Sequence, residues 1–507
     1  MILHRRTHNS QDPAMNTLKT ITTSILVAAL LGMLTGCGEF LGGGTNDDPN
    51  KLSRDQVQME ALLPPILVES GQATFDVGSS FSRYTQHVTG EGTLDEQEFT
   101  RLNGAWSSIY LRALNNADVL VEKAREQNSP HYLGIAKVVQ AYNLGLATTV
   151  WEDVPWSEAF EDGQLNPTYD SQEQIYTVID TLLDGAIREL QKTPSEFATP
   201  GDDDIVYGGD EDQWIRLANA LRARYAIHLT NKGAVDAANN ALSAASNAMT
   251  GNGDDFQVDY NGEKNLNPYH TGAVLAAQTG NPFPIQADQL VDMMNGTTYP
   301  EFDPRLPKIA DKGEDANYFG SVSGAHATNP DGPDNSSTVN FTSNTFHSRA
   351  DAPILMMTYA ELKFIEAEAQ FLIDNGGDET ATGASADAYQ AYLDGIEANM
   401  DKLGVDPSDR DDYLTASTVD VGASNLTMEL IMKEKYKALF LNPEVFVDLR
   451  RYDFDSSIFR DLELPESHNP DLNGQWIKRA LYPSTELERN RSSIPAVNPE
   501  DPMWFME

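Results

Sequence analysis

Apolar residues that recur at alternating steps of three and four constrain the fold of this chain more than any other feature. The first such set is Trp106, Tyr110, Ala113, Ala117, Leu120 and Ala124. The second set, after the break at Asn128-Ser129-Pro130, is Tyr132, Ile135, Val139, Tyr142 and Leu146. This spacing places each set on one face of an α-helix, where core packing is the simplest interpretation. The two segments are therefore predicted to form an antiparallel helical hairpin.

The same pattern continues along the chain, with one long interruption. Segments 172–190 and 212–230 form a second predicted helix pair. Between 251 and 350, Gly, Asn, Pro, Asp and Ser crowd together without a sustained period, which is typical of a functional or disordered insertion. Helices are expected again from Ile354, over about 386–402 and over about 427–441, before an irregular tail that begins at Asp461.

Helix hairpins of roughly 34 residues are typical of tetratricopeptide (TPR) arrays, although the strict consensus is missing here. The predicted fold is therefore mainly α, a TPR-like helix-pair scaffold with long irregular loop insertions.

The N-terminal segment predicts a secretory lipoprotein signal. An apolar run from Ile21 to Leu34 follows a short basic start and leads to Gly36-Cys37. Cys37 is the single cysteine of the chain, and it stands where a bacterial lipoprotein signal needs a thiol for a diacylglyceryl group. Several acyl chains anchor a protein stably in a membrane. An ordinary signal peptide is the alternative, and Met15 is the expected true start in place of Met1.

The chain is thus predicted to divide into five parts. These are the signal peptide (1–36), a flexible tether (37–50), an N-terminal helical part (51–250), a loop-rich insertion on the ligand side (251–350), and a C-terminal helical part with an irregular tail (351–507).

Composition excludes several classes of function. With 77 acidic against 35 basic residues the net charge is −42, which disfavours nucleic acid as a partner because a phosphate backbone is bound by clustered Lys and Arg. One cysteine excludes a disulfide framework and a cysteine-rich metal site. The hydrophobic share of 40% fits a soluble, loop-rich body.

A series of motifs follows in a characteristic order. They are Trp106-Ser-Ser-Ile-Tyr110 with Asn115-Asn-Ala-Asp118, Trp151-Glu-Asp-Val-Pro-Trp156-Ser-Glu-Ala159, Pro167-Thr-Tyr-Asp170, Trp214 with Leu217-Ala-Asn219-Ala-Leu-Arg222-Ala-Arg224, Asp303-Pro-Arg-Leu306, Met357-Thr-Tyr-Ala-Glu361 with Glu366-Ala-Glu368, Glu444-Val-Phe446-Val-Asp448-Leu-Arg450-Arg451, and Arg479-Ala-Leu-Tyr482-Pro483. In this order, and with the lipoprotein cysteine, they resemble the SusD/RagB family of outer-membrane nutrient-binding lipoproteins over almost the whole mature chain.

The resemblance implies both a fold and a role. It implies four TPR-like helix pairs as a scaffold, with irregular insertions that carry the ligand surface. It implies a lipid-anchored protein on the outside of the outer membrane, which acts as a lid on a TonB-dependent transporter of the SusC type and captures oligosaccharides for import. Some members of the family bind peptides instead.

Sugar binding needs aromatic platforms and planar polar groups on exposed loops. The resemblance places ligand contacts near the N-terminus and in the insertion. The predicted platforms are Tyr84, His87, Phe99, Tyr318, Phe319 and Phe346, with Gln86 and Asn317 as partners for sugar hydroxyls. The alternative for each ring is a buried anchor of its loop.

Charged motifs are interpreted as structural. Asp448, Arg450 and Arg451 are expected to form charge-assisted pairs that lock the last helices, with an anion site as the alternative. Glu361, Glu366 and Glu368 are expected on a solvated helix face.

One acidic turn raises the question of a metal. Asp202-Asp203-Asp204 with Asp210 supply oxygen ligands of the kind that calcium prefers. The alternative is a solvated acidic turn, because the alternating spacing of an EF-hand loop is missing.

No enzyme signature is found. The chain has no His-Glu-x-x-His, no G-x-S-x-G, no P-loop and no dinucleotide fingerprint, so no cofactor and no catalysis are predicted. The predicted function is capture and hand-over of glycans at the cell surface. A surface glycoside hydrolase and a peptide-binding member of the same family remain as alternatives, whereas a two-lobed α/β solute-binding lipoprotein is disfavoured by the helical periodicity.

Overall fold

The computed structural model describes residues 57–90, 97–161, 163–193, 198–279, 285–313, 316–325 and 338–507. Contacts within the chain group Gln58–Glu507 into one unit. The predicted signal peptide, the tether and Cys37 lie outside the described residues.

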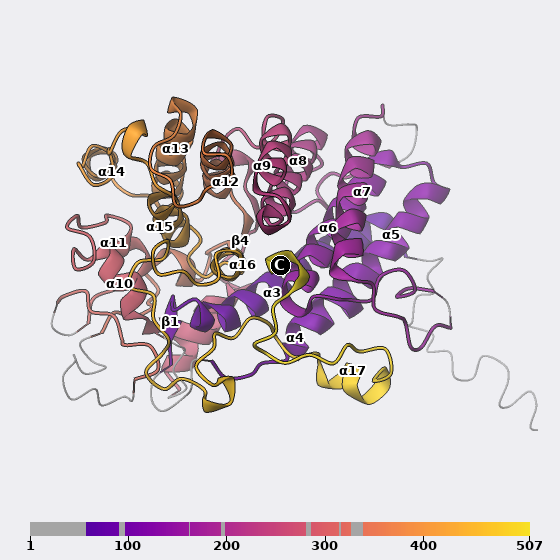
Figure 1. The fold of residues 1–507 in the computed structure, drawn as a ribbon. Coiled ribbons are helices and arrows are strands. Elements are labelled where there is room, and N and C mark those ends of the chain that lie inside the picture. The colour runs from indigo at the N-terminus through magenta and orange to yellow at the C-terminus, as the bar shows by residue number, and fades with distance from the viewer. Residues whose placement is uncertain are drawn as a thin grey trace, which may run out of the picture. The chain divides into compact units, whose positions relative to one another are not determined.

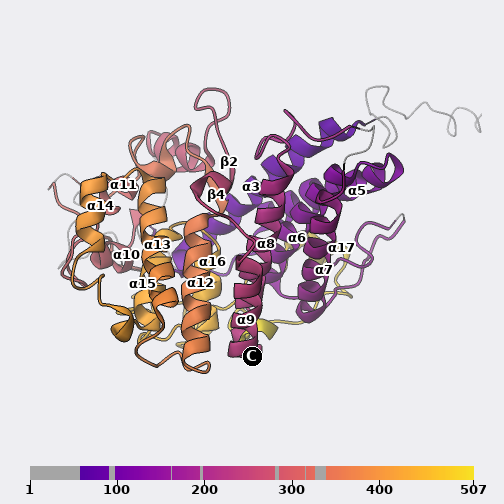
Figure 2. The same ribbon diagram turned by 90° about the horizontal axis from the view of Figure 1, so that it is seen from above.

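A row of helices forms the scaffold of this unit, and each helix packs against the next. Their order is α5 (Asn115–Glu126), α6 (Pro130–Trp151), α7 (Gln172–Leu190), α8 (Glu211–Ile227), α9 (Ala234–Ala245), α12 (Tyr359–Asp374) and α13 (Ala386–Leu403), and they lie side by side in Figure 2. The mainly α, TPR-like fold is thus confirmed, and the predicted hairpins correspond to α5–α6 and α7–α8. Helices α9 and α12 are neighbours although the whole insertion separates them in sequence.

Local sequence explains where these helices begin and how closely they pack. Ser171 caps α7 in a capping box with Gln174, because each side chain accepts a hydrogen bond from the backbone of the other residue. Helices α6 and α8 meet at Gly145, where an added Cβ atom would overlap the hydroxyl group and ring of Tyr225. A larger residue at this crossing would therefore separate the two helices.

The first long helix is one that the sequence patterns did not reveal. Helix α3 (Met59–Tyr84) packs on α5, α6 and the strand pair β2–β4, and buries Leu63, Ile66, Val77 and Phe81. Pro64 and Pro65 stand inside this helix and disguise its periodicity. Ahead of α5, a short helix α4 (Asn103–Trp106) and a π-helical segment (107–114) complete the first predicted helix.

In the described residues of the insertion and its flanks, the regular elements are short. Strand β1 (Val88–Thr89) pairs antiparallel with β3 (Ile285–Gln286), and β2 (Phe256–Val258) pairs antiparallel with β4 (Ile354–Met357). Two short helices follow β3, namely α10 (Asp288–Met294) and α11 (Leu306–Ile309). The helix predicted from Ile354 is present as α12, but its predicted start was too early, because the apolar run from Ile354 to Met357 forms β4 and the side chain of Thr358 then caps the helix.

The C-terminal part continues with α14 (Pro407–Leu414), α15 (Met428–Ala438), α16 (Glu444–Arg451) and α17 (Ser484–Arg489). Figures 1 and 2 both show α10, α11 and α14 at the same end of the helix row, away from α5. The irregular tail returns to the first hairpin, where the Trp151 indole donates to the carbonyl of Leu481 at 3.2 Å. No described helix is both long and apolar enough to cross a membrane.

Buried ion pairs join α8, α12, α15 and α16. Arg451 binds Glu368 through two hydrogen bonds of 2.7 and 3.1 Å and also binds Asp448 at 2.6 Å. Arg224 binds Glu361 through two hydrogen bonds of 2.6 Å. The locking role predicted for Asp448 and Arg451 is confirmed.

Two expectations about these charges need correction. Glu361 and Glu368 are not solvated but almost fully buried, because arginines of α8 and α16 neutralise them inside the helix stack. Arg450 has no carboxylate partner in the described part of the chain, and it donates instead to the carbonyls of Phe446, Thr149 and Lys478. Burial lowers the pKa of Arg450 to about 9.

Candidate functional site

Three predicted ligand residues lie in the core. Tyr84 ends α3 with 4% exposure, and its hydroxyl donates to the carbonyl of Glu98. Gln86 is equally buried and donates to the carbonyl of Glu463. The His87 ring is fully buried against Tyr436 and Phe440. The expectation that these three side chains stand on an exposed loop is wrong, because α3 extends to Tyr84 and the segment after it is tied to the C-terminal half.

Two further candidates differ from each other. Phe346 is 7% exposed, with its ring beneath the guanidinium of Arg349 at 5.1 Å, so it too anchors its segment and is not an exposed platform. Phe99 is half-buried.

The remaining candidates reach the surface of the insertion. Asn317 is exposed, Tyr318 is half-buried and Phe319 is 38% exposed. The Tyr318 ring lies 5.7 Å from the ring of Phe302, which is itself 47% exposed. Phe302 and Tyr318, whose rings lie against each other, are named the ring cluster below.

Phe302 was not among the sequence candidates. The signal that marks it is an aromatic residue between Pro300 and Pro304 in a segment without helical periodicity. Prolines on both sides disfavour a regular element, which leaves the ring in a loop.

A groove opens beside Phe302, between the segment that leads into α11 and the helix α14. Its volume is about 520 Å³. Pro304, Pro307 and Lys308 line one side. Side chains of α14 and its flanks line the other, namely Asp406, Asp409, Asp412, Tyr413 and Ala416. The volume lies in the range of small-ligand sites, and the exposed ring of Phe302 at the edge offers a flat apolar surface.

Buried charges fix the floor of this groove. The Tyr413 hydroxyl donates to Glu434 at 2.9 Å, and Lys437 donates to the same hydroxyl at 3.1 Å. Arg305 binds both Asp303 and Glu434. Burial, together with the charges of Asp303 and Glu434, raises the pKa of Tyr413 well above its ordinary value, so the phenol stays neutral. The floor therefore presents a fixed, uncharged ring.

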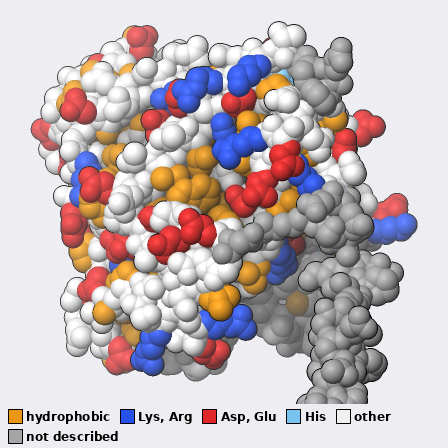
Figure 3. Space-filling model, turned by 90° about the vertical axis from the view of Figure 1, so that its right-hand side faces the viewer, with side chains coloured by type: hydrophobic (Ala, Val, Ile, Leu, Met, Phe, Trp, Pro, Cys, Tyr) orange, Lys and Arg blue, Asp and Glu red, His pale blue; other side chains and the backbone are white. Residues whose placement is uncertain are grey.

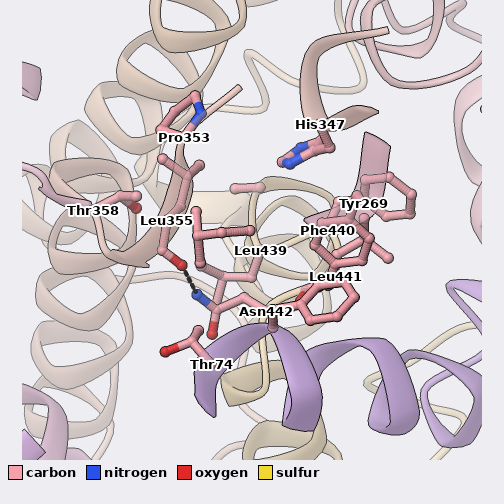
Figure 4. Close-up of a pocket in the computed structure, with 13 residues that line it drawn as sticks. Thr74, Tyr269, His347, Pro353, Leu355, Thr358, Leu439, Phe440, Leu441 and Asn442 are labelled. Atoms are coloured by element: carbon pink, nitrogen blue, oxygen red, sulfur yellow. Dashed lines mark hydrogen bonds between the residues drawn. The ribbon is translucent and has the colours of Figure 1, made fainter. Parts of the chain in front are cut away.

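The small cavity in Figure 4 has a different character. Its volume is about 20 Å³, enough for one water molecule, and it lies among Thr74, Tyr269, His347, Leu355 and Asn442. Asn442 donates to the carbonyl of Leu355 across it. This cavity is a packing gap beside α3, too small for a sugar ring.

Figure 3 shows another face, the right-hand side of Figure 1, where apolar side chains gather among charges of both signs. Val68 of α3 is 41% exposed and Leu111 of the π-helical segment is 67% exposed. Arg112 pairs with Glu69 at 3.2 Å, next in sequence to these two residues. These side chains are aliphatic and offer no aromatic platform.

The acidic turn that raised the question of calcium has other partners. The Asp203 carboxylate accepts from the Tyr132 hydroxyl, Asp204 accepts from the Trp214 indole at 2.7 Å, and Asp210 caps α8. Among the described residues no group of three or more His, Cys, Asp or Glu is arranged to hold a metal ion. A calcium ion at this turn stays a prediction.

The architecture places the chain in the class of TPR-like helical proteins that present an irregular, ring-bearing insertion beside the scaffold. Within that class, a family model matches residues 49–483, and its description is SusD-like, starch-binding and associating with the outer membrane. The chain therefore belongs to the SusD-like family, whose members are associated with the outer membrane.

Solved structures confirm the fold. A SusD/RagB family protein from Bacteroides thetaiotaomicron is 21% identical, with 89% of this chain and 99% of that chain covered and a TM-score of 0.69. A SusD homolog from Bacteroides fragilis is 22% identical, with 89% and 100% covered and a TM-score of 0.69. A chitin-binding SusD homolog from Flavobacterium johnsoniae is 19% identical, with 89% and 98% covered and a TM-score of 0.70. No curated protein matches the chain in sequence.

Proposed function

We propose that this protein captures glycans at the surface of the outer membrane and binds them at the groove between α11 and α14 and at the ring cluster. The observation that carries the proposal is the pairing of an open groove of about 520 Å³ with the half-exposed rings of Phe302 and Tyr318. The flat apolar faces of sugar rings stack on such side chains.

Membership of the family supports this choice of ligand. The family description names starch, and one structural neighbour is a chitin-binding protein. SusD-like proteins bind their ligands without turning them over, so we propose capture without catalysis for this chain too.

The proposal is tested by retention of the chain that follows Cys37 on a panel of immobilised polysaccharides. Phe302→Ala combined with Tyr318→Ala is expected to weaken binding to the retained polymer roughly thirty-fold, since each of the two lost aromatic contacts costs on the order of 1 kcal/mol. Leu111→Ala is the matched control, because it removes an exposed apolar side chain of a segment between α4 and α5, at the other end of the helix row. Retention on peptides alone would refute glycan capture, and release of reducing ends from the polymer would favour a hydrolase.

The proposal includes attachment to the membrane through lipid on Cys37. The support is the position of this single cysteine directly after the apolar run and Gly36. Cys37→Ala is expected to release the protein from the membrane fraction, because the acyl chains provide most of the membrane affinity. Continued sedimentation of the variant with membranes would contradict the anchor.

The proposal also includes a partner, a TonB-dependent transporter of the SusC type that receives the captured glycan. The support is the family alone. Affinity purification of the lipid-anchored protein from detergent-solubilised outer membranes is expected to bring down a β-barrel transporter of this type. Recovery of the protein without it, under detergent conditions that keep other membrane complexes intact, would contradict the partnership.

A further inference from the structure

The carboxylates of the groove are distributed unevenly between two faces of α14. The helix and its cap carry Asp406, Asp409, Asp411 and Asp412, but only one cation, Arg410. Arg410 binds Asp411 at 2.8 Å and Asp401 of α13 at 2.6 Å. Arg410 therefore pairs with carboxylates on the side of α14 that faces α13.

The carboxylates on the groove side have no such partner. Asp409 and Asp412 are exposed, stand three residues apart on the helix and line the groove, and within the described ranges no cation or hydrogen-bond donor pairs with either side chain. Asp406 uses one oxygen, Oδ1, to cap the helix through Ser408, and these hydrogen bonds together with the charge of nearby Lys308 lower its pKa, so Asp406 is not counted as unpaired.

A fourth carboxylate lines the same groove from the insertion. The Oε2 atom of Glu301 is enclosed and accepts no hydrogen bond from the described part of the chain. Against these four acids stands one cation on the groove wall, Lys308. The cations below the floor, Arg305 and Lys437, are already bound to Asp303 and Glu434.

These observations point to the chemistry of the ligand. A sugar ring stacked on Phe302 would place its substituents in the groove. There the carboxylates of Asp409 and Asp412 have no hydrogen-bond donor or cation as a partner among the residues that the structure describes. An ammonium group on the sugar would form charge-assisted hydrogen bonds with them, whereas a sulfate or uronate group would meet like charge.

We propose that the groove selects glycans whose sugars carry free amino groups, such as deacetylated hexosamine polymers, over their acetylated or anionic counterparts. The inference rests on the proposed function, because it assigns the ligand class of the same groove. Asp409 and Asp412 are the specificity-determining residues.

The test compares fully deacetylated and fully acetylated chito-oligosaccharides of equal length by isothermal titration calorimetry at mildly acidic pH. The deacetylated oligomer is expected to bind on the order of ten-fold more tightly at low ionic strength, the range of a hydrogen bond to a charged group. The preference should shrink as salt rises from about 0.01 M to roughly 0.5 M, because exposed charges are screened. It should also vanish above the pKa of the sugar amine.

Variants separate the groove from the charge of the whole protein. With a net charge of −42, any polycation is attracted to the surface. Asp409→Asn with Asp412→Asn is expected to abolish the preference for the deacetylated oligomer. Asp212→Asn with Asp236→Asn removes the same charge from exposed positions on α8 and α9 and is expected to keep the preference.

The outcomes distinguish this inference from the proposed function. Equal binding of the two oligomers by the unmodified protein, or an unchanged preference in the Asp409/Asp412 variant, overturns the inference and leaves glycan capture intact. A preference that falls equally in both double variants also overturns it, since general attraction then explains the effect. Absence of binding to either oligomer and to every polysaccharide of the panel overturns the proposed function itself.

Discussion

A buried histidine makes the stability of this protein sensitive to acid in a way that the structure specifies. The backbone N–H of Leu441 donates to Nδ1 of His87 at 3.2 Å, and Nε2 lies 3.1 Å from the carbonyl oxygen of Tyr436. Nδ1 must therefore accept and Nε2–H must donate, which fixes a neutral ring. Protonation of Nδ1 would break the hydrogen bond from Leu441 and bring the new N–H of the ring against the backbone N–H of Leu441.

The size of the effect follows from the pKa of this ring. Burial, helped by nearby His347, lowers the pKa of His87 from 6.5 to about 3. Below pH 6.5 the His87 ring binds a proton in the unfolded chain but stays neutral in the folded chain. The free energy of unfolding therefore falls as the pH falls towards 3. At pH 5 the loss is about 2 kcal/mol, since each pH unit in this window contributes about 1.4 kcal/mol.

Other groups titrate in the same range, so a difference between variants is the useful measurement. Burial also lowers the pKa of His347 to about 3, and the loss from His347 adds to that from His87. Burial raises the pKa of Asp288 to about 6, which acts in the opposite direction, because below pH 6 the folded chain binds the extra proton.

The assay is urea unfolding of the unmodified protein and of His87→Gln between pH 7 and pH 5. The unmodified protein is expected to lose about 2 kcal/mol more than the variant over this interval. His468→Gln, the same change in a ring near the surface, is the control and should keep the pH dependence of the unmodified protein. If His87→Gln and the unmodified protein show the same pH dependence, the assignment of a neutral buried ring is refuted.

Two further substitutions test the packing of the helix row. Gly145→Ala is expected to destabilise the protein by about 1–3 kcal/mol in urea unfolding, because the added methyl overlaps the ring of Tyr225, whereas Gly253→Ala meets open space and should be near neutral; equal effects would contradict the close helix contact. Glu368→Gln is expected to cost about 3 kcal/mol, the low end for a broken buried pair, because Arg451 keeps one of its two carboxylate partners. A thermal melt of Glu368→Gln that matches the unmodified protein would show that this pair contributes little.

The exposure of an aromatic ring could be predicted from the sequence where the ring stands in a segment with few regular elements. Tyr318 and Phe319 lie between short elements, and their partial exposure could be expected from the loop-rich composition around them. Tyr84 and His87 could not be judged in this way. Their burial depends on Phe446 and Tyr436, which lie more than three hundred residues further along the chain.

The groove itself was beyond the reach of sequence patterns. One wall is the short polar helix α14, whose apolar residues are too few to show a period. The other wall is a proline-rich segment of the insertion. The sequence of either segment alone predicts an exposed connection. The groove forms because the two segments face each other in the folded chain.

The sequence by itself determined the helix pairs, the break between α9 and α12, and the membership of a family, because helical periodicity and motif order are carried by residues close together in the chain. Tertiary structure decided which rings are exposed, which carboxylates are neutralised in the core, and which remain unpaired beside Phe302. The physical reason is that burial and pairing depend on partners brought from distant parts of the chain. The carboxylate of Glu368 forms an ion pair with Arg451 and is buried. The carboxylate of Asp409 has no cation as a partner in the described structure and lines the groove.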